Sequence, residues 1–299
     1  MTNPTSRSNK PVKHHHVPRA YLENFCLANR TFYQYILRPG KGGSINAQWA
    51  GGNPNTTGWV KHLYDSPTDT SDRCHVEAEL AKIERDAMKA IAQIIALKSN
   101  QFTFVTEPHV AKYIVAMAMR SPNAMRGKAL LDPLVKAGLV MGDFPNNPGP
   151  AGVLRDIRAI QPELKKITWY LYWFDGRDGR ILVTSDRPVG IYALAEQGRH
   201  TGTVLQAAPL EAAMPDNWAK HAIFTFPLTR ACAALGFKGP QKDLEYELGR
   251  QGGIECGDRL PGWVNAMSAW QASCVYTPDK GAKFLLPNPP NGPGEPQFT

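Results

Sequence analysis

Two polar segments of the sequence have the residue types that acid–base or metal chemistry needs. The first is the run of His14, His15 and His16, which lies just before Pro18, a residue that favours the first turn of a helix. A neutral imidazole can bind a metal or transfer a proton near pH 7. A histidine in this place can instead hydrogen-bond the backbone and fix the segment before the helix. The local sequence leaves both interpretations open and does not say which histidine matters.

The second segment presents a carboxylate where a strand is expected to end. Asp186 follows a hydrophobic run and a serine, and Pro188 then forces an extended backbone. Ligand sites are often built at strand ends, so Asp186 is a candidate catalytic or metal-binding residue. The alternative is that Ser185 and Asp186 close a turn through hydrogen bonds to nearby backbone.

A long helix is predicted to supply further carboxylates. Apolar residues recur every three or four positions over 75–98, which is the pattern of an amphipathic helix. Glu77 and Glu84 are seven residues apart and therefore project from one face, two turns from each other. Either one is a candidate metal ligand, and the alternative is a solvated flank of the helix.

Arg120 is expected at the end of a second helix, over 107–119, because Pro122 restricts the residue before it. A guanidinium there is suited to bind an anionic substrate or a carboxylate. A basic residue at the end of a helix also complements the helix dipole, which is the plainer interpretation.

The elements that must position these residues change in kind along the chain. The first half has mainly helical spacing, and residues 39–58 are predicted to form an irregular loop. From residue 167 onward the hydrophobic runs become short and rich in aromatic and β-branched residues, and 167–174 with 180–184 are predicted to form a hairpin. Helices first and strands later predict an α+β fold, with a helical N-terminal half packed on a mainly antiparallel C-terminal sheet. Weaker helices are expected at 130–141 and 153–160.

One folded domain is expected between two polar tails. Residues 1–13 are predicted to be a disordered leader, and 287–299 a disordered tail rich in proline and glycine. The single α+β domain is predicted to span 14–286, with a helix-rich part at 14–160 and a strand-rich part at 167–286.

The composition limits the partners and the compartment. The formal net charge of +8 favours a nucleic acid or another anionic ligand, although the basic residues are scattered rather than clustered. Five cysteines without a CxxC pair predict reduced thiols and a cytoplasmic protein. No apolar run approaches the roughly 20 residues that span a bilayer, so no membrane partner is expected.

Taken in order, these segments resemble the uncharacterised family called domain of unknown function 4238. The resemblance spans roughly residues 14–278 and depends on several short motifs in the same order. The opening motif of that family is matched by His15, Val17, Pro18, Tyr21, Leu22 and Phe25; the later ones are matched by Glu77 or Glu84, by Arg120-Ser121-Pro122, by Thr184 to Val189, by Phe226-Pro227-Leu228, and by Asn265 with Val275-Tyr276. The alignment favours His15 among the three histidines. The resemblance implies no particular activity, but it makes it less plausible that these polar residues are unrelated accidents.

Three functions follow as hypotheses, and the third is a nucleic-acid-binding protein without catalytic chemistry. In the first, the protein is a divalent-metal-dependent hydrolase acting on a phosphodiester or other anionic substrate, with Mg²⁺ or Mn²⁺ bound by His15, Glu84 and Asp186. His15 and Asp186 would also take part in catalysis, and Arg120 would bind the substrate. In the second, the same residues form a buried polar network in a non-catalytic binding or sensor module that has a protein partner. Such a module would act in bacterial stress or phage defence. Whether the protein is an enzyme is left open by the sequence.

Overall fold

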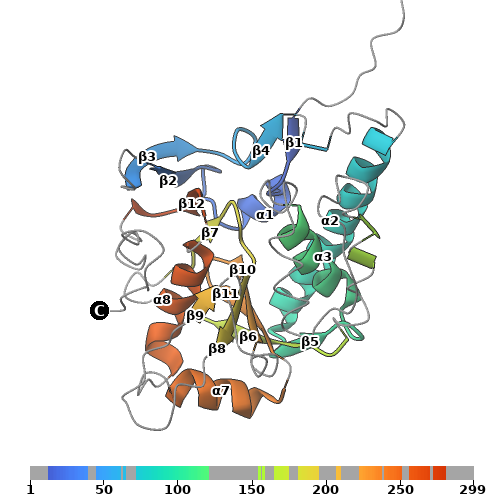
Figure 1. The fold of residues 1–299 in the computed structure, drawn as a ribbon, viewed down its shortest axis with the longest axis vertical. Coiled ribbons are helices and arrows are strands. Elements are labelled where there is room, and N and C mark those ends of the chain that lie inside the picture. Colours follow the sequence, from blue (N-terminus) through green and yellow to red (C-terminus); the bar gives the residue numbers. More distant parts are fainter. Residues whose placement is uncertain are drawn as a thin grey trace, which may run out of the picture.

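The strands of the described residues form three antiparallel sheets, of two, six and four strands (Figure 1). The structure is a computed structural model of the 299-residue chain. It describes residues 13–39, 45–61, 63–64, 72–120, 154–155, 157–158, 165–174, 181–194, 207–209, 222–237, 239–250, 256–269 and 272–280.

The six-stranded sheet has the strand order β5-β6-β11-β10-β8-β9, and every neighbouring pair is antiparallel. Its centre is apolar on both faces: all six residues of β11 are buried. Aromatic and β-branched side chains favour extended backbone in such surroundings. The strands are β5 (Gln101–Thr103), β6 (Thr168–Trp173), β8 (Gly190–Leu194), β9 (Ala207–Pro209), β10 (Ala222–Thr229) and β11 (Cys232–Phe237).

The four-stranded sheet joins segments from opposite parts of the chain. Its order is β3-β2-β12-β7, so a hairpin from the first sixth of the chain pairs directly with a strand near residue 275. A separate pair of strands, β1 and β4, forms the third sheet, which we call the N-terminal ribbon. These strands are β1 (Lys13–His15), β2 (Phe32–Pro39), β3 (Ile45–Gly52), β4 (Trp59–Lys61), β7 (Thr184–Ser185) and β12 (Cys274–Thr277).

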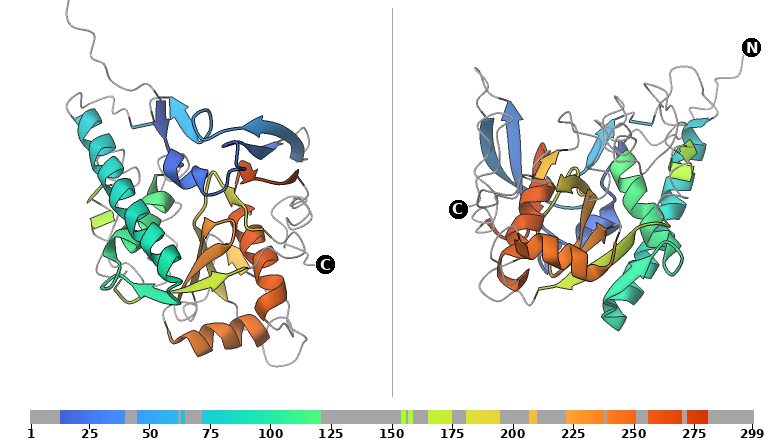
Figure 2. Two further views of the ribbon diagram at one scale, coloured as in Figure 1. Left: turned by 180° about the vertical axis from the view of Figure 1, so that it is seen from behind. Right: turned by 60° about the horizontal axis from the view of Figure 1, so that its bottom comes forward.

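Two helices, α2 (Asp72–Leu97) and α3 (Pro108–Met119), lie side by side on one flank of the molecule, and α7 (Gln241–Arg250) and α8 (Cys256–Ala269) lie on the other (Figure 2). Helix α2 buries its residues at three- and four-residue intervals, as its sequence predicts. Helix α3 begins at a proline, which fits the first helical position, and eight of its twelve residues are buried. The short helix α1 (Arg19–Glu23) lies between the ribbon and the sheets.

The main core is formed where α1, α2 and α3 meet the six-stranded sheet. Tyr21 of α1 is fully buried, stacks on Phe226 of β10 with ring centroids 5.1 Å apart, and contacts Tyr113 of α3. Its hydroxyl donates to the carbonyl of Pro227 at 2.6 Å and also pairs with Thr184 of β7 at 2.8 Å. Tyr21 therefore ties the motif segment after the histidines to two sheets at once.

The predicted α+β arrangement is wrong. In the described residues the N-terminal half is not a helical layer packed on a C-terminal sheet, because it holds β1, β2, β3, β4 and β5. Residues 45–52, predicted as loop, form β3, because eight residues of β2 pair with them. The predicted hairpin is also wrong, since β6 pairs with β5 and β11 while β7 pairs with β12.

Some sequence predictions fall where the structure makes no statement. The predicted helix at 130–141, the leader apart from Lys13, and the tail at 287–299 lie outside the described residues. Helical turns are present at 154–155 and 157–158, within the segment predicted at 153–160. The division of the chain into one domain stays a prediction. In the part of the chain that is described, no helix is long and apolar enough to cross a membrane.

Candidate functional site

The histidine segment is held at the edge of the molecule by the N-terminal ribbon. In β1, His14 pairs with Val60 and His15 with Trp59 of β4. The chain then turns, and the backbone amides of His16 and Val17 both donate to the carbonyl of Gly58, at 2.9 and 3.1 Å. Gly58 has a φ of +72°, a conformation that glycine adopts without strain. These contacts hold the histidines in the ribbon.

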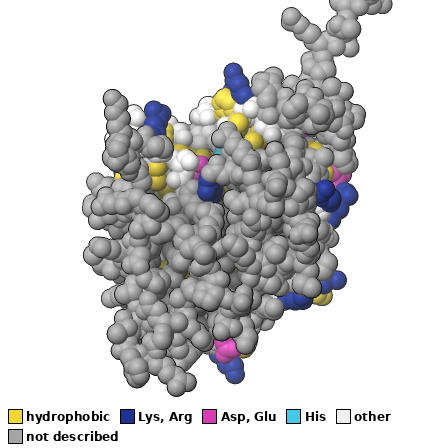
Figure 3. Space-filling model, viewed as in Figure 1, with side chains coloured by type: hydrophobic (Ala, Val, Ile, Leu, Met, Phe, Trp, Pro, Cys, Tyr) yellow, Lys and Arg dark blue, Asp and Glu magenta, His cyan; other side chains and the backbone are white. Residues whose placement is uncertain are grey.

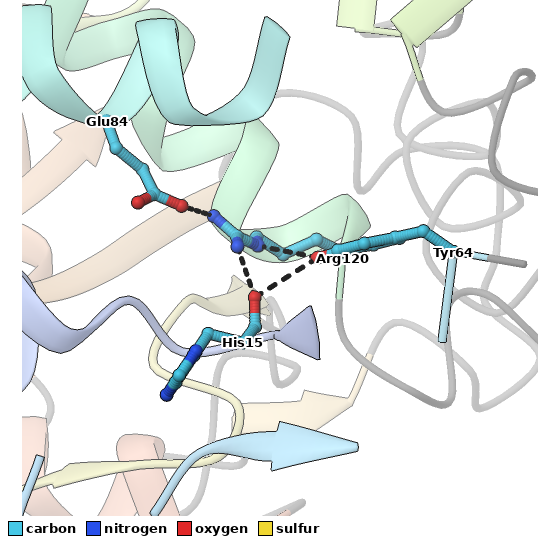
Figure 4. A network of polar contacts seen from close by, with 4 residues as sticks. All are labelled: His15, Tyr64, Glu84 and Arg120. Atoms are coloured by element: carbon cyan, nitrogen blue, oxygen red, sulfur yellow. Dashed lines mark hydrogen bonds and ion pairs between the residues drawn. The ribbon is translucent and has the colours of Figure 1, made fainter. Parts of the chain in front are cut away.

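Arg120 lies at the C-terminal end of α3 and is only 2% exposed. Its three guanidinium nitrogens all donate to groups of the protein (Figure 4). Nε donates to the hydroxyl of Tyr64 at 3.0 Å, Nη1 pairs with Glu84 of α2, and Nη2 donates to the backbone carbonyl of His15. We call Arg120, Glu84, Tyr64 and His15 the arginine centre.

Tyr64 completes the arginine centre from the segment that follows β4. Its hydroxyl donates to the carbonyl of His15 at 3.2 Å, so that carbonyl accepts from both Tyr64 and Arg120. Its backbone amide donates to Nδ1 of His14 at 3.0 Å, and the two rings stack with centroids 5.0 Å apart. His14 is thus held by its imidazole, whereas His15 is held by its backbone.

Burial decides the charges in and around the arginine centre. Burial would lower the pKa of Arg120, but Tyr64 and Glu84 raise it more, so the guanidinium stays charged. Burial and Arg120 lower the pKa of His15, and the same causes lower that of His16 to about 3. Burial raises the pKa of Glu77, although Arg120 opposes this. Both histidines are therefore neutral at pH 7, next to a permanent cation.

Four buried polar atoms close to Arg120 have no hydrogen-bond partner: Nε2 of His15, Nδ1 of His16, Oε2 of Glu77 and the hydroxyl of Tyr113. The charge of Arg120 acts on the pKa of each of these side chains. The imidazole of His15 points away from the guanidinium in Figure 4. All three guanidinium nitrogens of Arg120 therefore have hydrogen-bond partners, whereas several polar side-chain atoms around them do not.

Asp186 lies just after β7 and binds the backbone of β12. Its Oδ1 accepts from the amides of Ser273 and Cys274 at 3.0 and 3.2 Å, and its own amide donates to the carbonyl of Cys274 at 3.0 Å. Burial raises the pKa of Asp186 to about 6, with the two amides opposing the shift. The carboxylate thus fastens two neighbouring strands of the four-stranded sheet.

Asn265 of α8 fixes the strand segment that leads to Asp186. It is fully buried, accepts from the amide of Val183 at 2.8 Å and donates to the carbonyl of Ile181 at 2.9 Å. Asp186 and Asn265 therefore both bind backbone groups. The turn-closing alternative fits Ser185, whose Oγ accepts from the amide of Arg187 at 3.0 Å, whereas Asp186 binds the backbone of a strand that is distant in sequence.

The structure brings three of the four candidate residues together and places the fourth among other partners. Glu84, Arg120 and the carbonyl of His15 meet in the arginine centre, whereas Asp186 contacts β12. Among the residues that the structure describes, no group of three or more His, Cys, Asp or Glu side chains is arranged to hold a metal ion. The predicted ligand set of His15, Glu84 and Asp186 for Mg²⁺ or Mn²⁺ has no such cluster to support it.

Sequence reasoning missed Tyr64 and Gly58. Tyr64 lies in a segment without any recognisable motif. Its role depends on contacts with His15 and Arg120, which lie 49 and 56 positions away in the sequence. The positive φ of Gly58 can be inferred from glycine only when the turn is known. Glu77 was an alternative to Glu84, and the ion pair with Arg120 distinguishes the two.

A model of the family described as Protein of unknown function (DUF4238) matches residues 13–273. The chain belongs to this family, as the order of its motifs indicated. No curated protein and no solved structure matches the chain.

Proposed function

We propose that the protein is a non-catalytic binding module in which Arg120 fixes the position of the N-terminal ribbon. The observation that carries this proposal is the use of Arg120 itself. Each of its guanidinium nitrogens donates within the protein, and the side chain is 2% exposed. An arginine that recognises a substrate needs donors directed toward that substrate. The geometry of Arg120 instead supports a structural role.

A buried ion pair is well suited to fix the position of a segment. Removing one partner of such a pair typically destabilises a protein by about 3–5 kcal/mol, because the other charge is left without compensation. Arg120 also binds the carbonyl of His15, which belongs to the ribbon. A displaced ribbon would therefore leave a buried donor unpaired, which disfavours other placements of β1.

The divalent-metal-dependent hydrolase stays a prediction. It requires Glu84 and Asp186 to bind one metal and Arg120 to bind the substrate. Oε1 of Glu84 already pairs with Arg120, and Oδ1 of Asp186 already accepts two backbone amides. A metal would have to compete with these contacts, so the binding module is the better-supported function.

The proposal includes a cytoplasmic location. Cys26, Cys232 and Cys274 are free thiols, which persist where the surroundings are reducing. The partner of the module would be an anionic ligand, as the net charge of +8 favours, or another protein.

Thermal melts with Mg²⁺, Mn²⁺ and Zn²⁺ test whether the protein has the metal site that the hydrolase requires. The wild type is compared with Asp186→Ala and with Glu84→Gln, which keeps an oxygen facing Arg120. We expect Asp186→Ala to melt at a lower temperature, since two amides lose their acceptor. We expect no metal to raise the melting temperature of the wild type specifically. A metal-specific rise that both variants abolish would overturn the proposal in favour of the hydrolase, because a ligand of the folded state raises its stability.

A further inference from the structure

One face of the β2–β3 hairpin carries three neighbouring aromatic rings, of which Tyr35 also packs against the buried residues Val183 and Val275. Tyr33 and Tyr35 alternate along β2 and therefore point to one face, and Trp49 of β3 pairs directly with Tyr35. Ring centroids are 4.9 Å apart for Tyr35 and Trp49, and 6.4 Å apart for Tyr33 and Trp49. The opposite face of β2 is different, since Phe32 is 1% exposed and packs on Tyr276 in the core.

This aromatic face is partly exposed and has open space beside it. Tyr33, Tyr35 and Trp49 all have intermediate exposure. The strand partner of Tyr33 is Gly51, and a Cβ built on Gly51 would meet nothing within 4 Å. No side chain therefore covers the ring of Tyr33 from the position of Gly51 on β3.

Lysines lie next to partly exposed aromatic rings both at this hairpin and on the ribbon. Nζ of Lys280 lies 5.0 Å from the ring centroid of Tyr33. On the ribbon, Nζ of Lys13 lies 4.4 Å from the ring of Trp59, and Lys61 pairs with Lys13 across the strands. Figure 3 shows Lys and Arg side chains next to hydrophobic ones along the upper edge, where Figure 1 places β3 and β4.

Rings next to lysines match the chemistry of a single-stranded nucleic acid. Every base offers a flat π-face that can stack on an aromatic side chain, whatever the sequence. The phosphates between the bases are neutralised by lysines, with release of counterions. In a duplex the base faces are already stacked on one another, so exposed rings favour a single strand.

We propose that Tyr33, Trp49 and Lys280, with the lysines of the N-terminal ribbon, form a binding surface for single-stranded nucleic acid. This inference rests on the proposed function and names the ligand class of the module. Bases stack on Tyr33 and Trp49, and Lys280 moves from the ring of Tyr33 to a phosphate. The arginine centre contributes by holding β1, and hence Lys13, in register with β4.

Fluorescence anisotropy with labelled 20-nucleotide oligo(dT) and oligo(U) tests the surface. Trp49→Ala and Tyr33→Leu are each expected to weaken binding about 5- to 100-fold, the effect of losing one stacked base. Lys280→Gln changes an exposed side chain. It is expected to reduce the magnitude of the slope of log affinity against log salt concentration by about one, the effect of losing one phosphate contact. Lys89→Gln is the matched control, because Lys89 is also exposed but lies on α2, and it is expected to leave the slope unchanged.

Two results would overturn the surface. One is equal affinity of the wild type for single strands and for a duplex, with no loss in Trp49→Ala or Lys280→Gln. The other is no binding of either oligonucleotide together with Trp49-dependent binding to vesicles of phosphatidylserine and phosphatidylcholine, which would assign the surface to a membrane. Thermal melts show whether each variant is folded, and Lys280→Gln decides the outcome if an aromatic variant is not.

The same samples separate this inference from the proposed function. Gel electrophoresis of the oligonucleotides after incubation with Mg²⁺ or Mn²⁺ shows whether they are cleaved. Cleavage by the wild type but not by Asp186→Ala would overturn the non-catalytic module and leave the binding surface standing. Absence of binding without cleavage would overturn the surface alone.

Discussion

At the scale of single residues, neighbouring histidines of the motif make different contacts. The imidazole of His14 accepts from the amide of Tyr64 and stacks on its ring. His15 contributes its backbone carbonyl to the arginine centre, and its Nε2 has no partner. Because a substitution to alanine keeps the backbone carbonyl, the two positions should respond differently.

We therefore expect His14→Ala to destabilise the protein more than His15→Ala. The loss at His14 should be about 1–3 kcal/mol, the effect of leaving a buried amide without an acceptor. The loss at His15 should be smaller, because the contacts with Arg120 and Tyr64 remain. Urea unfolding measures both. A larger loss in His15→Ala would show that its imidazole, and not its carbonyl, is the important group.

Asp186 gives the protein a dependence on pH that can be isolated. Its pKa is raised from 3.8 to about 6 in the folded state, so the folded state holds its proton more tightly than the unfolded state. The resulting stabilisation is complete below the ordinary pKa and is lost as the pH rises through about 6. Asp186→Asn keeps an oxygen acceptor for the two amides but does not ionise.

Relative to Asp186→Asn, the wild type is expected to lose stability between pH 4 and pH 7. This interval begins close to the ordinary pKa of Asp186 and extends past its raised pKa of about 6. Melting temperatures of both proteins over this range supply the test. Both proteins contain the same histidines, so their difference reports on Asp186. A wild type that gains stability relative to the variant as the pH rises would contradict the raised pKa.

At the scale of elements, the turn between β1 and α1 depends on Gly58, which lies just before β4. Its carbonyl accepts the amides of His16 and Val17, and its φ of +72° suits glycine. A Cβ added here would lie 3.0 Å from both Cβ and the carbonyl oxygen of Val17. Gly262 of α8 offers a matched contrast, because a Cβ built there meets nothing within 4 Å.

Gly58→Ala is expected to lower the free energy of unfolding by more than about 1 kcal/mol, from the strained backbone and the contact with Val17. Gly262→Ala should instead raise it by about 0.5–1 kcal/mol, because alanine is the better helix former. Chemical denaturation of the two variants side by side measures the contrast. Equal and small effects would mean that the turn at Gly58 is not constrained.

The sequence predicted an element well where its apolar residues repeat with one dominant period. Helix α2 spans 72–97, close to the predicted 75–98, because its apolar residues repeat at helical intervals. Strand β3 was missed because its sequence is rich in Gly, Ala and Asn, which disfavour a strand on their own. Pairing with all eight residues of β2 overcomes that preference.

At the scale of the whole molecule, strand pairing between distant segments is what the sequence could not provide. Strand β12 pairs with β2 across about 240 residues, and β6 pairs with β11 rather than with the strand that follows it. Such pairings depend on which edges are free after other elements have packed, and no local pattern encodes that. The fold class was wrong for this reason.

The meeting of Arg120 with Glu84 and the histidine segment was anticipated from the order of the family motifs, although the contacting atom of His15 was not. Motif order says that residues share a site, but only the geometry separates an imidazole from a carbonyl. Asp186 was grouped with them for the same reason and binds β12 instead. The catalytic and metal-binding roles of His15, Glu84, Arg120 and Asp186 stay predictions.

The most direct measurement of the central claim is a double-mutant cycle of Arg120→Met and Glu84→Met in urea unfolding. Arg120→Met alone is expected to destabilise the protein by about 3–5 kcal/mol, because Glu84 is left partly buried without its cation. In the Glu84→Met background the same change should cost at least about 1 kcal/mol less, which is the coupling of residues in one network. Additive effects, with Arg120→Met close to neutral, would contradict a structural arginine and return Arg120 to the role of a ligand-binding residue.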